Sequence, residues 1–281
     1  ALKMIHNLKL KQFRRKRADN IQPESKLFFN EYSHEIFERI SLIKNQFKNG
    51  MTFGFRNTKI PKSKNIQNLF HADIYKSKTT NIISDEEFLP IRGNSLDLIV
   101  SFFNIHFVND IPGTLFQINQ SLKANGLFIA CLFAGDTLKE LRYCLMSAEE
   151  EILGGTSPKI SPFADLNDLS SLLQRANFTL PVADIDRHKI VYKNPEKLFS
   201  DIREMGETNI LNERQKNFSR KDVIERTLEI YKKRFSNKDG KIYSTFEIAW
   251  LLGWKYDENQ PKPLTPGSGK KNLEEAINEL S

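Results

Sequence analysis

The chain has 281 residues, of which 39% are hydrophobic and 27% are charged, so it is long enough for one large α/β domain and unlike a disordered chain. Two cysteines are too few for the disulfide framework of a small secreted scaffold, and no apolar run reaches the roughly 18 residues that a membrane-spanning helix needs. The formal net charge is +7, but seven Lys and Arg residues against one acid fall within residues 1–20. Because the remainder is nearly neutral, we expect no nucleic-acid partner.

Residues 1–24 are predicted to form a basic N-terminal arm ahead of the folded domain. A solvated segment is the simplest interpretation, and contact with acidic lipid, RNA or an acidic protein is the alternative. Peripheral membrane contact through residues 1–20 is therefore one hypothesis. The near absence of acids is also typical of part of an organelle transit peptide, although the arm is not rich in serine.

The first half of the chain predicts a helix followed by a parallel sheet. Apolar residues recur every three or four positions over 29–43, which indicates an amphipathic helix, and short strands are expected at 51–55 and 66–72. Residues 96–103 form a continuous apolar run, as expected of a strand covered on both faces. A helical stripe separates this run from a second one at 127–133. Strand, helix and strand within about 40 residues indicate a right-handed βαβ unit.

The second half repeats helices and closes with a strand. Residues 246–254 place an apolar side chain at every second position, the period of a strand with one buried face. Residues 257–281 are predicted to be an irregular tail with a short helix, which leaves 25–256 as the folded domain. Between them, the expected elements are helices near 166–172, 198–205 and 224–235, and a strand around 190–192.

Two acidic residues follow strands where an open parallel sheet binds its ligands. Asp73 comes directly after the strand at 66–72, where a carboxylate can accept hydrogen bonds from a ribose diol. Asp85 begins the segment DEEFLP, where a carboxylate can accept the amine of adenine while Phe88 or Leu89 packs on the ring. Taken together, 12 residues apart and ahead of a buried strand, the two acids favour a ligand site over two unrelated surface residues.

Several longer stretches resemble class I S-adenosylmethionine-dependent methyltransferases. They are NSLDLIVS (94–101), NIHFVND (104–110) and GLFIACLFAGDTLKELR (126–142). More narrowly, the chain is similar to the branch that contains the malonyl-carrier-protein methyltransferase of biotin synthesis and the mitochondrial NADH dehydrogenase assembly factor described as an arginine hydroxylase. The assembly-factor side fits better at MGETN (205–209), FEIAWLLGW (246–254) and PLTPGS (263–268).

The resemblance implies a Rossmann-like α/β methyltransferase fold, a mostly parallel seven-stranded sheet with an antiparallel last strand. It also implies S-adenosylmethionine as the cofactor. Asp73 matches the ribose-binding acid and Asp85 the adenine-side acid, and the implied cofactor-binding set is Gly54, Asp73, Asp85, Glu86 and Ser101.

His106, within NIHFVND, matches the family position that overlooks the transferred group. Its imidazole exchanges protons near neutral pH, so it is a candidate general base or substrate-positioning donor. The alternative is a polar strand-end residue that bonds only to the backbone. The five histidines show no short metal-ligand spacing, so we predict no zinc site, although an iron triad assembled from distant residues stays open.

The chain departs from the family at the first strand, where an acid and a glycine turn, roughly D-x-G-x-x-x-G, are expected. Thr52 replaces the acid, Gly54 is retained and Thr58 replaces the second glycine. Glycines there let the backbone approach the cofactor closely, so the substitutions narrow the site. Arg56 is predicted either to face solvent or to pair with the carboxylate of the cofactor. This departure makes a decayed or repurposed pocket an open alternative.

Three functions follow from these observations. The first is a methyltransferase that acts on a protein or carrier-bound substrate. The second is arginine hydroxylation in respiratory complex I assembly, with an NADH dehydrogenase subunit as the partner. The third is a non-catalytic assembly scaffold with a degenerate cofactor site. The scarcity of cysteine favours a cytoplasmic location, with the mitochondrial matrix, associated with the inner membrane, as the alternative.

Overall fold

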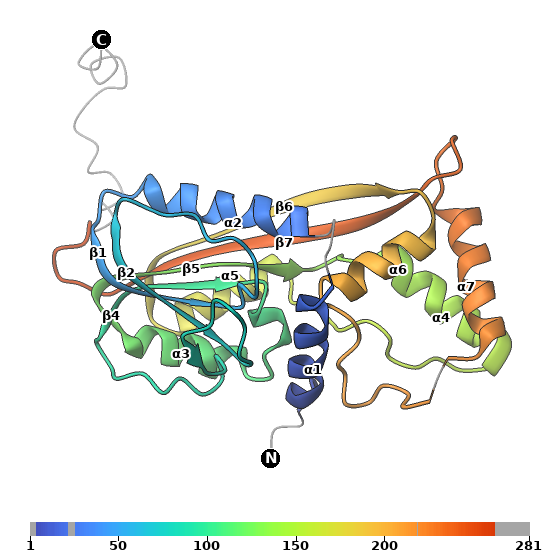
Figure 1. The fold of residues 1–281 in the computed structure, drawn as a ribbon, viewed down its shortest axis with the longest axis horizontal. Coiled ribbons are helices and arrows are strands. Elements are labelled where there is room, and N and C mark those ends of the chain that lie inside the picture. Colours follow the sequence, from blue (N-terminus) through green and yellow to red (C-terminus); the bar gives the residue numbers. More distant parts are fainter. Residues whose placement is uncertain (1–3, 22–25, 218, 262–281) are drawn as a thin grey trace, which may run out of the picture.

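The computed structural model describes residues 4–21, 26–217 and 219–261, and its centre is a seven-stranded sheet in the order β3-β2-β1-β4-β5-β7-β6 (Figure 1). Strands β1 to β5 pair in parallel, whereas β7 runs antiparallel to both β5 and β6. The predicted fold class is thereby confirmed. The strands are β1 Phe47–Phe53, β2 Ile66–Asp73, β3 Ile82–Ile83, β4 Leu96–Phe102, β5 Leu122–Ala134, β6 Phe178–Tyr192 and β7 Ile242–Lys255.

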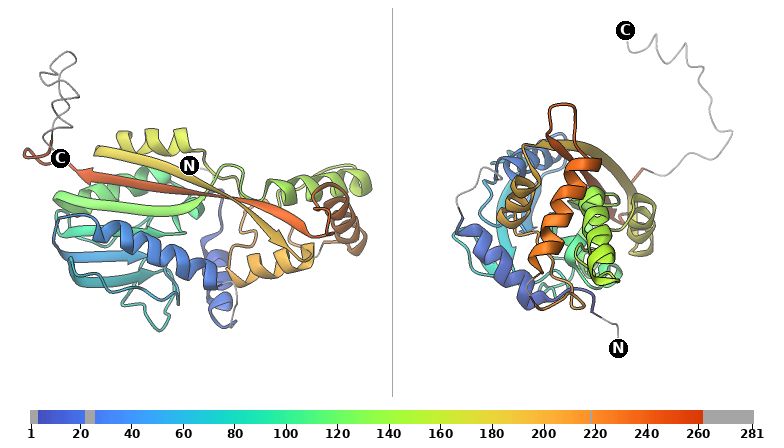
Figure 2. Two further views of the ribbon diagram at one scale, coloured as in Figure 1. Left: turned by 90° about the horizontal axis from the view of Figure 1, so that it is seen from above. Right: turned by 90° about the vertical axis from the view of Figure 1, so that its right-hand side faces the viewer.

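Helices cover both faces of the sheet (Figures 1 and 2). Helix α2 lies over one face, α3 and α5 lie over the other, and α4, α6 and α7 extend beyond one end of the sheet. The helices are α1 Leu8–Asp19, α2 Lys26–Ser41, α3 Ile111–Ser121, α4 Lys139–Leu153, α5 Leu166–Arg175, α6 Pro195–Glu204 and α7 Lys221–Arg234, with a short 3₁₀ turn at Ile105–Phe107.

The core has two layers, one on each side of the sheet. Leu98 and Val100 of β4 pack toward the α2 side, whereas Ile99 packs toward α3 and α5. All three are fully buried, which explains why the middle of β4 is apolar on both faces. Ile36 of α2 is also fully buried, and burying a side chain of this size contributes about 1.5–3 kcal/mol.

The two last strands differ in how well the sequence predicts them. Strand β7 lies between β5 and β6, so the predicted strand over 246–254 is confirmed, but the expected single buried face is wrong, because both faces are buried over 246–251. Strand β6 spans 15 residues, far more than the prediction around 190–192. Because β6 is an edge strand with many exposed polar side chains, its hydrophobic pattern is weak. Most of the predicted tail, with its short helix, lies outside the described residues. Along the part of the chain that the structure describes, no helix combines the length and apolarity needed to cross a bilayer.

The prediction of a solvated N-terminal arm is wrong for residues 8–19, which form helix α1. Asn7 caps this helix by accepting a hydrogen bond from the Leu10 amide, 2.9 Å away. Lys11 and Arg15, four positions apart on one helix face, are completely buried. Hydropathy misses such a face, because charged side chains are buried only when tertiary partners compensate them. These two cations are therefore unavailable to an acidic membrane surface.

Candidate functional site

The predicted site residues gather at the carboxyl ends of the central strands, between β1 and β4, where the strand order reverses. Gly54 directly follows β1, Ser101 lies near the end of β4 and Asp73 ends β2. Glu86 comes from the loop after β3, and it is buried together with Asp73 and Ser101. This is the place where open α/β sheets bind ligands.

Gly54 is required by the backbone turn that leaves β1. Its φ is +77°, a conformation that side-chain-bearing residues rarely adopt. A Cβ at this position would lie 2.4 Å from the Phe102 carbonyl oxygen and 2.8 Å from Cβ of Asn104. The retained glycine therefore keeps the β1 turn in close contact with the end of β4.

The two buried acids each keep one carboxylate oxygen without a hydrogen-bond partner. Asp73 accepts the Ile74 amide at 2.8 Å through Oδ1, and its Oδ2 is unpartnered. Glu86 accepts Asn104 Nδ2 at 2.7 Å through Oε2, and its Oε1 is unpartnered. Burial raises the pKa of both carboxyls, that of Glu86 to about 7. Buried acceptors of this kind are available to hydroxyl or amine donors.

Asp85 differs from its neighbour Glu86. Its side chain accepts the Glu87 amide at 3.1 Å and so closes the turn in which it lies. The residue is only partly buried, whereas Glu86 is completely buried. The adenine-side role of Asp85 stays a prediction, and Glu86 is the acid of the pair that belongs to the buried cluster.

Helix α1 inserts two cations into this acidic cluster. The Arg15 guanidinium donates to Oδ1 of Asn104 and, at 2.9 Å, to the Phe103 carbonyl. The Lys11 ammonium is completely buried without a hydrogen-bond partner and interacts electrostatically with Asp85, Glu86 and Asp73. Burial lowers the pKa of Lys11, and these carboxylates oppose the shift. The crevice is therefore filled by the chain's own helix.

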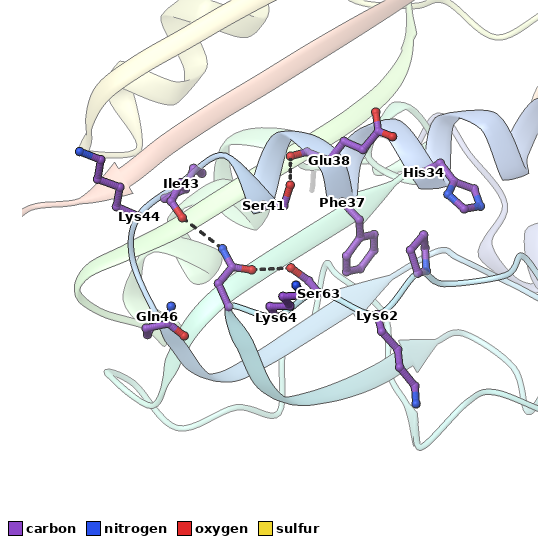
Figure 3. A pocket seen from close by; sticks show the side chains of 12 residues that line it. His34, Phe37, Glu38, Ser41, Ile43, Lys44, Gln46, Lys62, Ser63 and Lys64 are labelled. Carbon is purple, nitrogen blue, oxygen red and sulfur yellow. Dashed lines mark hydrogen bonds between the residues drawn. The ribbon is translucent and has the colours of Figure 1, made fainter.

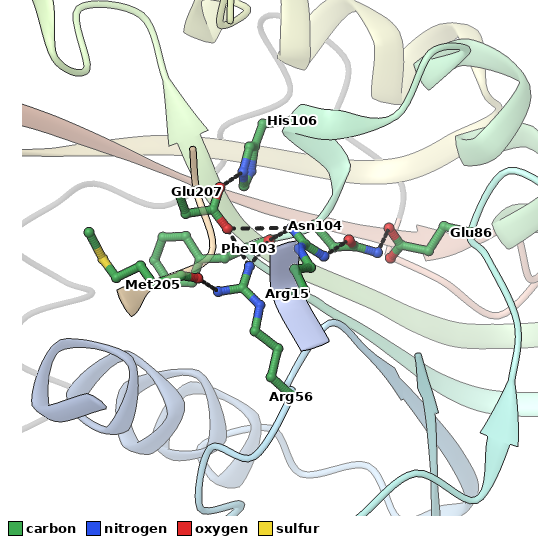
Figure 4. Close-up of polar contacts among 8 residues, drawn as sticks. All are labelled: Arg15, Arg56, Glu86, Phe103, Asn104, His106, Met205 and Glu207. Atoms are coloured by element: carbon green, nitrogen blue, oxygen red, sulfur yellow. Dashed lines mark hydrogen bonds and ion pairs between the residues drawn. The ribbon is translucent and has the colours of Figure 1, made fainter. Parts of the chain in front are cut away.

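Next to the acidic cluster, His106 is held by Glu207 (Figure 4). His106 Nε2 lies 2.8 Å from Oε2 of Glu207, while Oε1 accepts the guanidinium of Arg56 and, at 3.4 Å, that of Arg15. Burial alone would raise the pKa of Glu207, but Arg56, His106 and Arg15 lower it to about 2. Burial lowers the pKa of His106 to about 4, against the opposing effect of Glu207. At neutral pH the pair is thus a carboxylate and a neutral imidazole.

These charges determine which imidazole nitrogen is basic. An ionised Glu207 only accepts hydrogen bonds, so the proton of the neutral His106 ring resides on Nε2. Nδ1 then carries the lone pair, and it is buried without a partner. The alternative prediction, a histidine bonded only to the backbone, is wrong.

The prediction that Arg56 faces solvent is wrong, whereas its pairing with the carboxylate of the cofactor stays a prediction. The residue is 6% exposed, and its guanidinium donates to the Met205 carbonyl at 2.7 Å and to Glu207. It therefore binds a carboxylate of the protein itself. Its backbone has φ +56°, which shows that the β1 turn still has a left-handed shape at a position that favours glycine.

Three residues of this site carried no role in the sequence analysis: Glu207, Lys11 and Arg15. Glu207 lies in MGETN, a stretch identified by the resemblance. The neighbouring Gly206 has φ +74°, and a Cβ atom added there would lie 3.3 Å from the Cα atom of Arg15. The i, i+4 spacing of Lys11 and Arg15 is visible in the sequence, but the sequence does not show which acidic side chains lie next to these two cations. The three cations and three acids of this site come together only in the folded chain.

A cavity of about 520 Å³ lies away from this cluster, between α2 and the loop before β2 (Figure 3). It is lined by His34, Glu38, Lys62 and Lys64 among others, and by none of the predicted site residues. Among the residues that the structure describes, His, Cys, Asp and Glu form no group of three that could hold a metal ion.

Comparisons with known proteins agree with this geometry. Residues 60–130 match the family model described as a methyltransferase domain. The crystal structure of YcgJ from Bacillus subtilis has the same fold, with a TM-score of 0.53 over 80% of this chain and 99% of that protein at 13% identity. The chain is therefore a methyltransferase-fold protein.

Curated relatives are similar over a longer part of the chain. The arginine-hydroxylase NDUFAF5 of Mus musculus mitochondria is 42% identical over 72% of this chain and 58% of its own length. The human protein of that name is 42% identical over 68% of this chain and 55% of its own. The malonyl-[acyl-carrier protein] O-methyltransferase of Gallionella capsiferriformans is 30% identical over 62% and 57%. The chain thus spans a little over half the length of these relatives.

The residues of the site fit the chemistry of S-adenosylmethionine, the cofactor that the sequence resemblance implies. The unpartnered oxygens of Asp73 and Glu86 are suited to ribose hydroxyls and an adenine amine, and the Ser101 hydroxyl lies beside Glu86. The crevice between β1 and β4 is nevertheless occupied, because the side chains of Lys11, Arg15 and Arg56 fill it. Two of these three side chains, Lys11 and Arg15, belong to α1.

Proposed function

We propose that this chain is an S-adenosylmethionine-dependent methyltransferase of a protein or carrier-bound substrate, with His106 as the proton acceptor. The observation that carries the proposal is the orientation of His106 by Glu207, which leaves Nδ1 as a free base in a desolvated site. When bound, the cofactor supplies an electrophilic methyl group. The protein then needs only to hold a nucleophile in line and to take its proton.

Within this proposal the chain's residues have distinct tasks. Asp73 would hold the ribose. Glu86 would hold the adenine base, with Asp85 at the rim of the site. Gly54 keeps the β1 turn against β4, and Ser101 supports Glu86. Arg15 and Arg56 keep Glu207 ionised, so that Glu207 accepts a hydrogen bond from the Nε2–H group of His106 and does not take the substrate's proton itself. Aromatic rings of Phe107, Phe133 and Phe163 surround the imidazole and exclude water.

The partner and location are proposed from the relatives. The NDUFAF5 relatives are mitochondrial proteins that hydroxylate arginine by name. Their similarity supports a protein substrate in the respiratory chain, such as a subunit of NADH dehydrogenase, and favours the mitochondrial alternative. If the chemistry is hydroxylation, the substrate gains an oxygen atom, and if it is methylation it gains a methyl group. Mass spectrometry of a co-expressed substrate distinguishes the two.

A non-catalytic assembly role is the second candidate, and one observation favours it. Arg56 stands within the glycine turn and binds Glu207 across the crevice that the family uses for its cofactor. A crevice closed by internal ion pairs is compatible with a protein that acts through its surface. Cofactor binding separates this candidate from the first.

The test is calorimetric titration of the full chain with S-adenosylhomocysteine. We expect saturable heat for the natural sequence, at least tenfold weaker binding for Asp73→Asn and no change for Asp239→Asn, a control in an exposed hairpin. Lys11→Ala, which removes a side chain from the crevice, should bind more tightly. The methyltransferase proposal fails if neither the natural chain nor Lys11→Ala binds.

A further inference from the structure

A second cavity is lined by Glu207, the hydrogen-bond partner of His106. It has a volume of about 720 Å³ and lies among α1, α4, α6 and residues of the segment 207–217. Its apolar wall includes Phe107, Phe163 and Leu138, and Glu207 reaches its edge. This volume is typical of a pocket for a small molecule or for one chain-borne group. We refer to it as the basic pocket.

Most of the cations that line the basic pocket have no anionic partner, the exception being Lys159, which pairs with Glu149 at 3.1 Å. Among the residues that the structure describes, Arg14, Arg17, Arg203 and Lys216 show no side-chain hydrogen bond, ion pair or ring contact. Arg214 donates only to the Leu211 carbonyl, at 2.9 Å. These cations come from three separate segments: α1, α6 and the loop that follows Glu207.

The one carboxylate at the pocket edge does not compensate these cations. Glu207 already accepts from Arg15, Arg56 and His106, so its charge is used inside the protein. Arg14 is partly buried, and burial together with Arg214 and Arg17 lowers its pKa to about 10. Like charges gathered around an apolar cavity repel one another, and an anion bound between them relieves that repulsion.

We propose that the basic pocket binds the anionic group of the substrate, a carboxylate or a phosphate carried on an apolar chain. This inference rests on the proposed function, since it takes the pocket beside His106 as the substrate site. The cations bind the anionic end, and the apolar wall of Phe107, Phe163 and Leu138 packs the chain that leads to the reacting atom. A guanidinium in this pocket would only add a further positive charge. The geometry therefore favours an acidic substrate over an arginine side chain.

The test uses the full chain and three probes at low and physiological ionic strength: pyrophosphate, malonate and arginine amide. We expect saturable calorimetric binding of pyrophosphate or malonate, with the stronger of the two identifying phosphate or carboxylate as the preferred group. Binding should weaken as salt rises, since counterions compete for exposed cations. Arginine amide should not bind.

Two variants assign the binding to the pocket. Arg14→Gln with Arg214→Gln should weaken anion binding at least tenfold, whereas Lys232→Gln with Lys233→Gln removes the same charge from an exposed part of α7 and should leave it unchanged. The melting temperature of the pocket variant should be equal to or above that of the natural chain, because repulsion is removed.

The inference is overturned if neither anion binds, if both double variants weaken binding equally, or if arginine amide binds as well as the anions. Anion binding without binding of S-adenosylhomocysteine would reject the proposed methyltransferase and leave the pocket's preference standing. Binding of S-adenosylhomocysteine without anion binding would reject the basic pocket as an anion site and leave the proposed methyltransferase standing.

Discussion

Replacing Glu207 by glutamine tests whether its charge holds the site together. The substitution keeps the shape of the side chain but removes the one anion that Arg15 and Arg56 both contact. Two buried guanidinium groups would then share no carboxylate. The Glu207 side chain is 6% exposed and that of Arg15 is fully buried, so solvent does not compensate their charges. Removing one partner of a buried ion pair typically costs about 3–5 kcal/mol.

Linkage gives a similar magnitude. The pKa of Glu207 falls from 4.5 to about 2, and a shift of that size corresponds to about 3 kcal/mol of stability. Because the folded-state pKa is depressed, this stability is present above pH 4.5 and is lost as the pH falls toward 2. We therefore expect Glu207→Gln to lower the free energy of unfolding by about 3 kcal/mol at pH 7 and by little near pH 2.

Urea denaturation between pH 2 and pH 7 measures both values. Glu229→Gln is the control, because Glu229 forms an exposed ion pair with Arg226 and should change stability by no more than about 0.5 kcal/mol. The double variant Glu207→Gln with Arg15→Met should recover part of the loss, since it removes one uncompensated cation. A loss below about 1 kcal/mol at pH 7, or one that does not vary with pH, would refute the reasoning.

Three further predictions concern neighbouring residues. Gly54→Ala should lower the melting temperature well beyond Gly240→Ala, because both have φ above +70° but only Gly54 lacks room for a Cβ; equal shifts would show that the contact with Phe102 is not limiting. Burial favours the protonated carboxyl of Glu86, so the natural chain should lose stability as the pH rises from 4.5 through about 7, and Glu86→Gln should abolish this loss. Urea denaturation across this range should give free energies of unfolding for the two proteins that approach each other at low pH. The same pH dependence in both proteins would contradict the assignment. His106→Ala should lower turnover with little change in the affinity for S-adenosylhomocysteine, and unchanged turnover would eliminate its role as the proton acceptor.

The sequence by itself determined the sheet and the residues at its rim. Periodicity places β4, β5 and β7 because buried strands carry patterns that local residues alone define. The predicted strand at 66–72 also places Asp73 at a strand end, as the structure does. The resemblance points to the branch of methyltransferases that the relatives represent. The edge strand β6 was predicted short, because strand pairing and not hydrophobicity holds its polar residues in the sheet.

Tertiary structure alone decided what fills the site. In the sequence, Lys11, Arg15 and Arg56 are ordinary cations and Glu207 an ordinary acid, separated from them by more than a hundred residues. They become buried because each finds an opposite charge across the crevice, and the energy of burying a charge depends on partners that no local pattern contains. The same assembly orients His106 and leaves the cations of the basic pocket without a counterion.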